Sequence, residues 1–327
     1  MKKILWIGTG GTIASEMSED GFRPGLTSEQ LMKYVPGLAG KCAIDCVQPF
    51  NLDSTNIGPE HWLRMASIVR ESYDLYDGFV ITHGTDTMAY TAAALSYLIQ
   101  GPGKPVVLTG AQKPIGSEIT DSRKNLYDAF CCASGDEISG VVLVFNGKVI
   151  LGTRARKTRT KSFEAFESIN YPEIAAVDDW RITCYIGESR VDRPVFYDKL
   201  GREVLLLKLI PGMPEDALAW MLDNSDVLVV ESFGVGGLPD GMRRLINGRY
   251  RCGTVIMTTQ VQNEGSDISV YSVGSSLKSS GAVLETFDMT TEAVCAKAMW
   301  ILGQTRDRAE MERLFFTEIR KDILRRR

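Results

Sequence analysis

The chain has 327 residues, more than the roughly 100–200 of one typical domain, so the length predicts two domains or one large α/β unit. Hydrophobic residues make up 44% and charged residues 24%, an ordinary globular composition that excludes a disordered, collagenous or coiled-coil chain. Lys and Arg number 37 against 41 Asp and Glu, and the formal net charge of −4 gives no overall positive field to attract nucleic acid or anionic lipid.

Short apolar runs alternate with amphipathic segments along the chain. The first run, residues 4–7, stops at Gly8, too early for a signal peptide, and predicts a strand. No run approaches the ~18 apolar residues that span a membrane. Buried, mostly parallel strands are predicted at 4–7, 78–82, 106–108, 141–145, 204–210, 227–230 and 254–257. Helices are predicted at 28–35, where Thr27 and Gln30 form a capping box, at 59–73, 87–99, 126–133 and 215–222, and twice near the C-terminus.

This alternation predicts an α/β fold, with a doubly wound, mostly parallel sheet in a larger N-terminal domain and a smaller α/β C-terminal domain. The segment after residue 187 is charged and contains proline, which is typical of a connector. We therefore expect an N-terminal domain at 1–187, a linker at 188–203 and a C-terminal domain at 204–327.

The cysteine and histidine content of the chain bears on disulfides, metal sites and catalytic triads. The seven cysteines are odd in number and form no CxxC pair, which is typical of reduced thiols and favours a cytoplasmic location. Two histidines are too few for a His-rich metal site and give little support to a Ser-His-Asp triad. We expect no metal and no membrane or nucleic-acid partner.

A glycine-rich turn, residues 8–14 (GTGGTIA), follows the first predicted strand. Glycines allow the backbone to turn close to a ligand, with N–H groups free to hold an anion. A dinucleotide fingerprint needs a third glycine where Ile13 stands, and no Walker lysine follows, so nucleotide binding is weakly indicated. A tight turn with Thr12 as an ordinary cap explains the motif equally well.

A second polar motif, residues 82–88 (THGTDTM), follows another predicted strand and precedes an Ala-rich helix. Asp86 would lie at the helix N-terminus, where capping is the simplest explanation. One cap needs only one such side chain, however, and Thr85, Asp86 and Thr87 are consecutive. Because ligands bind at the carboxyl ends of strands in doubly wound sheets, the motif favours a site there.

Two further segments fit the same edge of the sheet. Residues 53–56 (DSTN) precede a predicted helix and are by themselves typical of a loop and helix entry. Residues 154–161 form a basic run, which is either a solvated face or the source of a lysine that enters the site and carries a proton.

Together these four segments resemble the bacterial L-asparaginase family, in particular its cytoplasmic type I branch. The first hallmark of the family is similar to residues 9–14 (TGGTIA) and the second to residues 83–92 (HGTDTMAYTA). The strand-end segment 109–114 (TGAQKP) and the lysine-bearing segment 146–157 match in the same order, and weaker similarity continues toward the C-terminus.

The resemblance implies a catalytic N-terminal domain with four catalytic residues. Thr12 would be the nucleophile that attacks the side-chain amide carbonyl of asparagine. Thr85 would be hydrogen-bonded to Lys157, which in turn approaches Asp86. A hydroxyl is a weak nucleophile without a nearby base, and no histidine is spaced to serve, so a Thr-Lys-Asp chain is a plausible substitute.

The resemblance also implies the substrate contacts. Asp86 would hold the α-ammonium group of the substrate and Ser54 its α-carboxylate, with Thr55 at a position that varies among members. Gly11 and Gly84 would line the substrate site, and backbone N–H groups near Thr12 and Thr85 would provide an oxyanion hole.

Two features of the sequence depart from the family pattern. Some members carry a tyrosine on the mobile loop after the nucleophile, whereas this chain has Phe22, which cannot relay a proton and is expected to act as a lid. Some cytoplasmic members also bind asparagine at an effector site, but Glu231 and Val261 stand where we would seek its arginine and cysteine, so allosteric control is not supported.

We therefore expect a cofactor-free amidohydrolase that converts L-asparagine to L-aspartate and ammonia through an acyl-enzyme, as a homodimer or homotetramer in which a neighbouring C-domain helps to close the site. One alternative is the asparaginase-like subunit of the archaeal-type Glu-tRNA amidotransferase, which passes ammonia to a partner and carries an extra N-terminal domain. Another is a nucleotide-binding or sensor module on the glycine turn, which leaves Thr85, Asp86 and Lys157 unexplained. Glutamine differs from asparagine by one methylene, so glutaminase side activity stays open.

Overall fold

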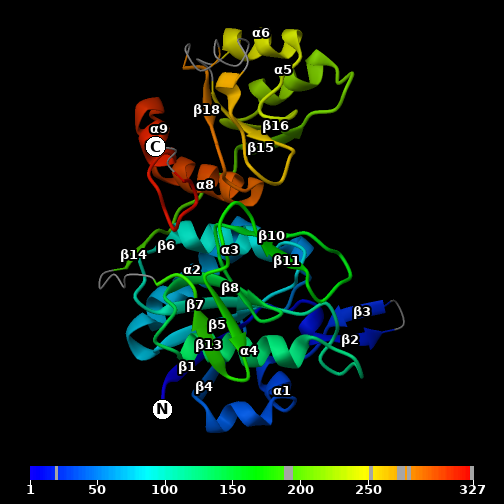
Figure 1. The fold of residues 1–327 in the computed structure, drawn as a ribbon, viewed down its shortest axis with the longest axis vertical. Helices are drawn as coiled ribbons and strands as arrows, with labels where there is room; N and C mark the ends of the chain where they lie inside the picture. Colours follow the sequence, from blue (N-terminus) through cyan, green and yellow to red (C-terminus); the bar gives the residue numbers. More distant parts are fainter. Residues whose placement is uncertain (19–20, 188–193, 250–252, 271–276, 278–280, 325–327) are drawn as a thin grey trace. The chain divides into compact units, whose positions relative to one another are not determined.

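The structure is a computed structural model that describes residues 1–18, 21–187, 194–249, 253–270, 277 and 281–324. The chain divides into two compact units, an N-terminal unit, Met1–Asp198, and a C-terminal unit, Lys199–Arg327 (Figure 1). This division falls inside the segment 188–203 that the sequence predicts as a linker.

A mixed sheet of eight strands forms the centre of the N-terminal unit. Its strands are β1 Lys3–Gly8, β4 Ala43–Val47, β5 Gly78–Thr82, β7 Pro105–Thr109, β8 Gly140–Phe145, β9 Lys148–Leu151, β12 Ala175–Asp178 and β13 Arg181–Cys184. Their order is β13-β12-β9-β8-β7-β5-β1-β4. The strands from β8 to β4 pair in parallel, and β9, β12 and β13 extend the β8 edge in antiparallel pairing.

Smaller pairs and helices surround this sheet. The antiparallel pairs are β2 Ser15–Ser18 with β3 Gly21–Pro24, β6 Ile99–Gln100 with β14 Val195–Phe196, and β10 Ala155–Lys157 with β11 Phe166–Ser168. The α-helices are α1 Ser28–Met32, α2 Pro59–Ser72, α3 Met88–Leu98 and α4 Ser122–Ser134, and the short 3-10 helices are η1 Thr12–Ala14, η2 Pro36–Gly40, η3 Ser54–Asn56 and η4 Tyr73–Leu75. In the ranges that the structure describes, no helix is long and apolar enough to cross a membrane.

Two helices differ in extent from the sequence prediction. The capping box of α1 is confirmed, because the Thr27 hydroxyl accepts from Gln30 N and the Gln30 side chain accepts from Thr27 N. The helix ends at Met32 rather than at residue 35, because the residue before a proline is driven out of the helical region and Val35 precedes Pro36. Helix α4 begins at Ser122, four residues before the predicted start at 126.

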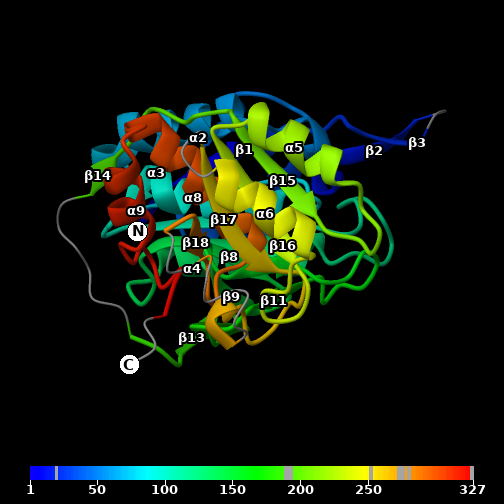
Figure 2. The ribbon, with the colours of Figure 1, turned by 90° about the horizontal axis from the view of Figure 1, so that it is seen from above.

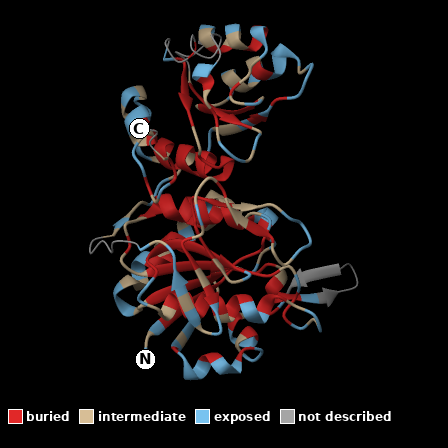
Figure 3. Cartoon of the chain, in the orientation of Figure 1, coloured by how far each residue is buried: buried red, intermediate tan, exposed pale blue. Residues whose placement is uncertain are grey.

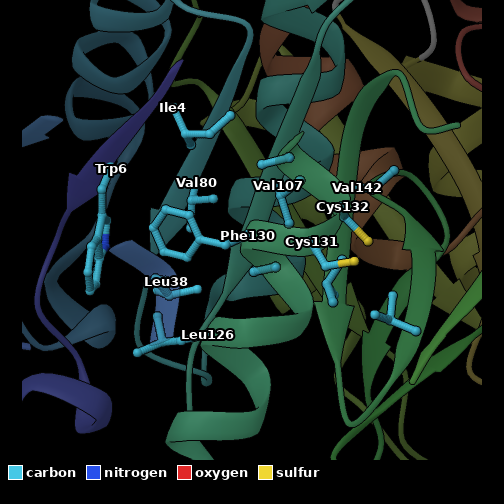
Figure 4. Close-up of a cluster of buried hydrophobic side chains, with 14 of the residues drawn as sticks. Ile4, Trp6, Leu38, Val80, Val107, Leu126, Phe130, Cys131, Cys132 and Val142 are labelled. Carbon is cyan, nitrogen blue, oxygen red and sulfur yellow. The ribbon is translucent and has the colours of Figure 1, made fainter. Parts of the chain in front are cut away.

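The core of the N-terminal unit lies on both faces of the parallel strands, which are wholly buried in β5, β7 and β8 (Figure 3). Helices α2 and α3 cover one face, and α1 and α4 cover the other (Figure 1). On the α4 face, Val80, Val107 and Val142 belong to one buried cluster with Phe130 (Figure 4). Phe130 meets the ring of Trp6 edge to face, with ring centroids 5.3 Å apart, so that β1 is fixed to α4 by aromatic packing.

The strand order places a topological switch beside β1. The chain crosses from β1 to β4 on one side and then returns to β5 on the other side of β1. In doubly wound sheets the crevice at the carboxyl ends of the strands on either side of such a switch is the usual ligand site. The turns after β1 and β5 therefore occupy the place where this fold binds ligands.

The C-terminal unit contains a smaller parallel sheet of four strands, β15 Val204–Lys208, β16 Val227–Ser232, β17 Thr254–Thr259 and β18 Val283–Glu285, in that order. Its helices are α5 Glu215–Asp223, α6 Asp240–Arg249, α8 Thr291–Gln304 and α9 Arg308–Phe315, with a 3-10 helix, η5 Ile268–Val270. Helices α5 and α6 lie over one face of this sheet (Figure 2). The predicted fold class, with a larger mostly parallel unit and a smaller α/β unit, is confirmed.

Candidate active site

The turn after β1 is held tightly against the turn after β5. Thr9 N donates to Thr82 O at 3.1 Å, and Gly11 N donates to Leu52 O at 3.0 Å. Gly11 has φ +79°, and a Cβ placed on it would lie 2.4 Å from Gly84 N and Cα. Only glycine fits this contact, and as a result Thr12, the first residue of η1, is carried to the edge of the second turn.

The segment before α2 approaches the same place. A Cβ on Gly84 would lie 2.7 Å from the Ser54 side chain, and Thr87 Oγ1 donates to Ser54 O at 2.7 Å. Ser54 is buried and Thr55 is exposed, with its amide and hydroxyl both donating to Asp53 Oδ1 at 2.8 Å. Three segments that are far apart in sequence thus meet at the carboxyl ends of β1 and β5.

Lys157, the last residue of β10, reaches this meeting point from a fourth segment. Its Nζ donates to Thr85 Oγ1 at 2.8 Å and to Asp86 Oδ1 at 2.7 Å. Thr85 is buried and the Lys157 side chain is 15% exposed, whereas the Asp86 side chain is 62% exposed. Lys157 therefore connects the buried hydroxyl of Thr85 to the carboxylate of Asp86, which solvent or a ligand can reach.

His83 lies beneath the second turn and is fully buried. Its Nδ1 lies 2.7 Å from Gly84 O, an acceptor, so Nδ1 carries the proton, and Nε2 accepts from the Thr91 hydroxyl at 2.9 Å. Thr91 in turn accepts from Trp62 Nε1 at 2.9 Å. Burial lowers the pKa of His83 to about 4, so the ring is neutral and both nitrogens are engaged in holding the turn.

The structure thus brings most of the predicted site residues together. Direct hydrogen bonds join Thr85, Asp86 and Lys157, and close approach of the backbone joins Gly11 and Gly84 to the Ser54 segment. Among the side chains that the structure describes, none hydrogen-bonds to the hydroxyl of Thr12, which is partly exposed. The backbone of Phe22 lies in β3, opposite Met17, and its side chain lies outside the described part of the chain.

One neighbour of Thr85 has no predicted role in the sequence analysis. Gln112 follows β7, the strand next to β5, and its Oε1 accepts from Thr85 Oγ1 at 3.1 Å. The only signal in the sequence was its position in the strand-end segment 109–114. Hydrogen bonding between side chains on different strand ends leaves no pattern in a single sequence.

The side chains at this edge include the hydroxyls of Thr12 and Thr85, the amine of Lys157 and the carboxylate of Asp86. A hydroxyl can attack a carbonyl carbon when a neighbouring base takes its proton, and backbone N–H groups at a turn can stabilise the resulting oxyanion. Fold and site together are typical of an α/β enzyme with a ligand site at the carboxyl ends of its parallel strands.

Comparison with known proteins identifies the family. Residues 3–189 match the model of the asparaginase N-terminal domain, and residues 203–315 match that of the glutaminase/asparaginase C-terminal domain. The chain is 38% identical to L-asparaginase of Thermococcus kodakarensis, over 98% of this chain and 99% of that protein, and 30% identical to L-asparaginase 1 of Escherichia coli, over 98% of each. It is 34% identical to a subunit of the glutamyl-tRNA(Gln) amidotransferase of Pyrococcus horikoshii, over 98% of this chain and 76% of that protein.

A comparison with solved structures indicates the same family. The structure of the thermostable L-asparaginase from T. kodakarensis superimposes with a TM-score of 0.93 at 37% identity and covers 99% of this chain and 100% of its own. The chain belongs to the asparaginase family and is an amidohydrolase.

Proposed function

We propose that this protein is an L-asparaginase that hydrolyses L-asparagine to L-aspartate and ammonia. The observation that carries the proposal is the hydrogen-bonded group of Thr85, Lys157 and Asp86 beside the Thr12 turn, in a chain whose full-length relatives are named L-asparaginases. A buried hydroxyl joined to a lysine and a reachable carboxylate offers both a proton path and a binding group for an amino acid.

In the proposed reaction, Thr12 Oγ1 attacks the side-chain amide carbon of asparagine and gives up its proton. Backbone N–H groups near Thr12 and Thr85 stabilise the oxyanion of the tetrahedral intermediate. Collapse of this intermediate breaks the C–N bond, the nitrogen takes the proton that Thr12 gave up, and the departing ammonia leaves a β-aspartyl ester on Thr12. Water then attacks the ester carbon, with Thr85 and Lys157 carrying its proton to the leaving Thr12 Oγ1, and release of aspartate restores the Thr12 hydroxyl.

The substrate contacts follow from exposure and charge. Lys157 binds Oδ1 of Asp86, and we assign Oδ2 of this exposed carboxylate to the α-ammonium group of the substrate. We assign Ser54, with Thr55 beside it, to the α-carboxylate. Phe22 is assigned to a lid.

The direct test is to mix purified protein with L-asparagine and to measure ammonia and aspartate. We expect the two products in equal amounts, without ATP and in the presence of EDTA. Protein that releases no ammonia from asparagine would refute the function, and release that needs a second protein would favour the alternative, an ammonia-supplying subunit of a Glu-tRNA amidotransferase. The same assay with L-glutamine measures the side activity.

We further propose a cytoplasmic homodimer or homotetramer whose catalytic domain ends at residue 187, with a linker at 188–203. No disulfide joins the six cysteines that the structure describes, which suits a reducing compartment. Light scattering of the purified protein measures the mass of the assembly, and a monomer at catalytic concentrations would contradict this part of the proposal.

A further inference from the structure

The turn after β7, residues 110–115, packs against both turns that carry the threonines of the candidate site. Ile115 N donates to Ile13 O at 3.3 Å, and both of these side chains are fully buried. Ile13 lies in η1 and directly follows the proposed nucleophile. At the start of the same turn, a Cβ on Gly110 would lie 2.2 Å from His83 O, in the turn after β5. The place of residues 110–115 therefore affects the positions of both threonines.

The same turn supports the β10–β11 hairpin, which carries Lys157. Nε2 of Gln112 donates to Ser162 O at 3.1 Å and to Arg159 O at 3.4 Å. Both carbonyls belong to the loop between β10 and β11. Residues 110–115 thus connect the helix of the nucleophile to the hairpin of the lysine, two elements that lie far apart in the sequence.

The buried carboxylate of Asp121 holds the backbone of this turn in place. Its Oδ2 accepts from Gln112 N at 2.9 Å, and its Oδ1 accepts from Lys113 N at 3.1 Å. Oδ2 also accepts from Asn125 Nδ2 at 3.1 Å, and the same Nδ2 donates to Gly110 O at 2.9 Å. The first turn of α4 therefore binds the turn after β7 at three successive points.

Neither helix capping nor an ion pair explains this carboxylate. Asp121 occupies the N-cap position of α4, but its side chain makes no capping hydrogen bond to that helix. Among the cationic side chains that the structure describes, none pairs with it. Its partners from the turn and from Asn125 only donate, so the ionised form satisfies all of them. An amide in its place keeps one accepting oxygen and turns a donor toward another donor.

We propose that Asp121 is a positioning residue that, through residues 110–115, sets the place of Thr12 relative to Lys157. This inference rests on the proposed function, because attack by Thr12 and proton transfer through Lys157 are steps of that reaction. A misplacement of about 1 Å, caused by a change away from the reacting atoms, can cost about a hundredfold in rate.

The cost should fall on the chemical step more than on substrate binding. Ser54 and Asp86 are the groups assigned to the substrate. In the described part of the chain neither of them hydrogen-bonds to residues 110–115. Displacement of the turn therefore leaves their own contacts in place, and kcat should change more than KM.

Asp121→Asn is the direct test, and Asp128→Asn is its matched control. Asp121→Asn keeps the size of the side chain and removes the acceptor that the turn needs. Asp128 is also a buried aspartate, about two turns further along α4, and its carboxylate pairs with Lys124. Its Asn variant removes a buried charge from the same helix and leaves the hydrogen bonds of residues 110–115 intact.

A milder change, Ser122→Ala, keeps the inference testable if Asp121→Asn does not fold. Ser122 is buried, and its Oγ donates to Lys113 O at 2.6 Å, so the alanine frees one carbonyl of the turn. The matched control is Ser134→Ala, because Ser134 Oγ donates to Phe130 O at 2.7 Å in the last turn of the same helix.

The experiment measures kcat and KM for ammonia release from L-asparagine at a temperature at which each variant is folded, together with Tm. We expect Asp121→Asn to lower kcat by at least about tenfold with KM changed by less than about threefold. Ser122→Ala should lower kcat by about threefold, and both controls should stay within about twofold of wild type, even where Asp128→Asn lowers Tm as much as Asp121→Asn does.

Three results for a folded Asp121→Asn would overturn the inference: kcat within about twofold of wild type, a loss confined to KM, or an equal loss of kcat in Asp128→Asn. If Asp121→Asn does not fold, wild-type kcat in Ser122→Ala overturns it instead. If wild type itself releases no ammonia from asparagine, the proposed function fails and this inference falls with it. An active wild type with an unaffected Asp121→Asn refutes the inference alone.

Discussion

Burial of His83 should make the N-terminal unit less stable at mildly acidic pH than at neutral pH. In the native chain burial lowers its pKa from 6.5 to about 4, whereas in the unfolded chain the imidazole is free to take up a proton near pH 6.5. The unfolded state therefore binds more protons between these two values, and stability falls as pH falls through this window. The loss from pH 7 to pH 5 amounts to about 2 kcal/mol and approaches about 3 kcal/mol near pH 4.

Urea unfolding at pH 7 and at pH 5 measures this effect. With an m-value of about 2 kcal/mol/M, the contribution of His83 lowers the urea midpoint at pH 5 by about 1 M. His83→Gln removes the titrating group, so its midpoint should shift less between the two pH values than that of wild type. His61→Gln removes the other histidine of the chain, at a partly exposed position, and serves as the control. Equal shifts in wild type and His83→Gln would refute the assignment of a neutral, buried imidazole.

Two further predictions concern catalysis. Lys157→Met should lower kcat more than it raises KM, because the volume of the side-chain stem stays and the proton carrier is lost. Asp86→Asn should also raise KM, because the partner of the substrate's ammonium group is lost. Small effects on KM alone in both variants would show that these residues only bind substrate. Phe22→Tyr should be nearly neutral and Phe22→Ala should lower kcat/KM by about tenfold or more with little change in Tm, since a lid needs a ring and not a hydroxyl; a large drop in Tm would place the ring in the core instead.

The central strands could be predicted from the sequence because their signal is local. Strands β5, β7 and β8 are uninterrupted buried runs, and the turns that follow them carry the polar residues. The antiparallel strands β12 and β13 were missed because each has only four residues. The AAVD sequence of β12 does not alternate between apolar and polar residues, and β13 is mostly exposed. Their pairing depends on contacts made only after the chain has folded.

In the candidate site, too, some residues could be predicted from the sequence and others could not. The polar motifs around Thr12 and Thr85 stand directly after strands and could be found from the sequence. The basic run 154–161 offered several cations, and residue spacing alone could not select Lys157. The structure separates them, because Arg154 is fully buried and only Lys157 is hydrogen-bonded to Thr85 and Asp86 among the described residues of this run. The contact between Gln112 and Thr85 could not be predicted, since it depends on two neighbouring strand ends meeting in space.

Hydrolysis of asparagine through a covalent bond to Thr12 is tested most directly by one measurement. It is the rate of ammonia release from L-asparagine by Thr12→Ala, compared with wild type at equal protein concentration. The Tm of both proteins is measured to check that the variant is folded. We predict a loss of roughly a thousandfold, a barrier increase of about 4 kcal/mol, with the fold intact because a partly exposed turn hydroxyl adds little to stability. Turnover within about tenfold of wild type, a barrier change of only ~1.4 kcal/mol, would contradict the role of Thr12 as the nucleophile.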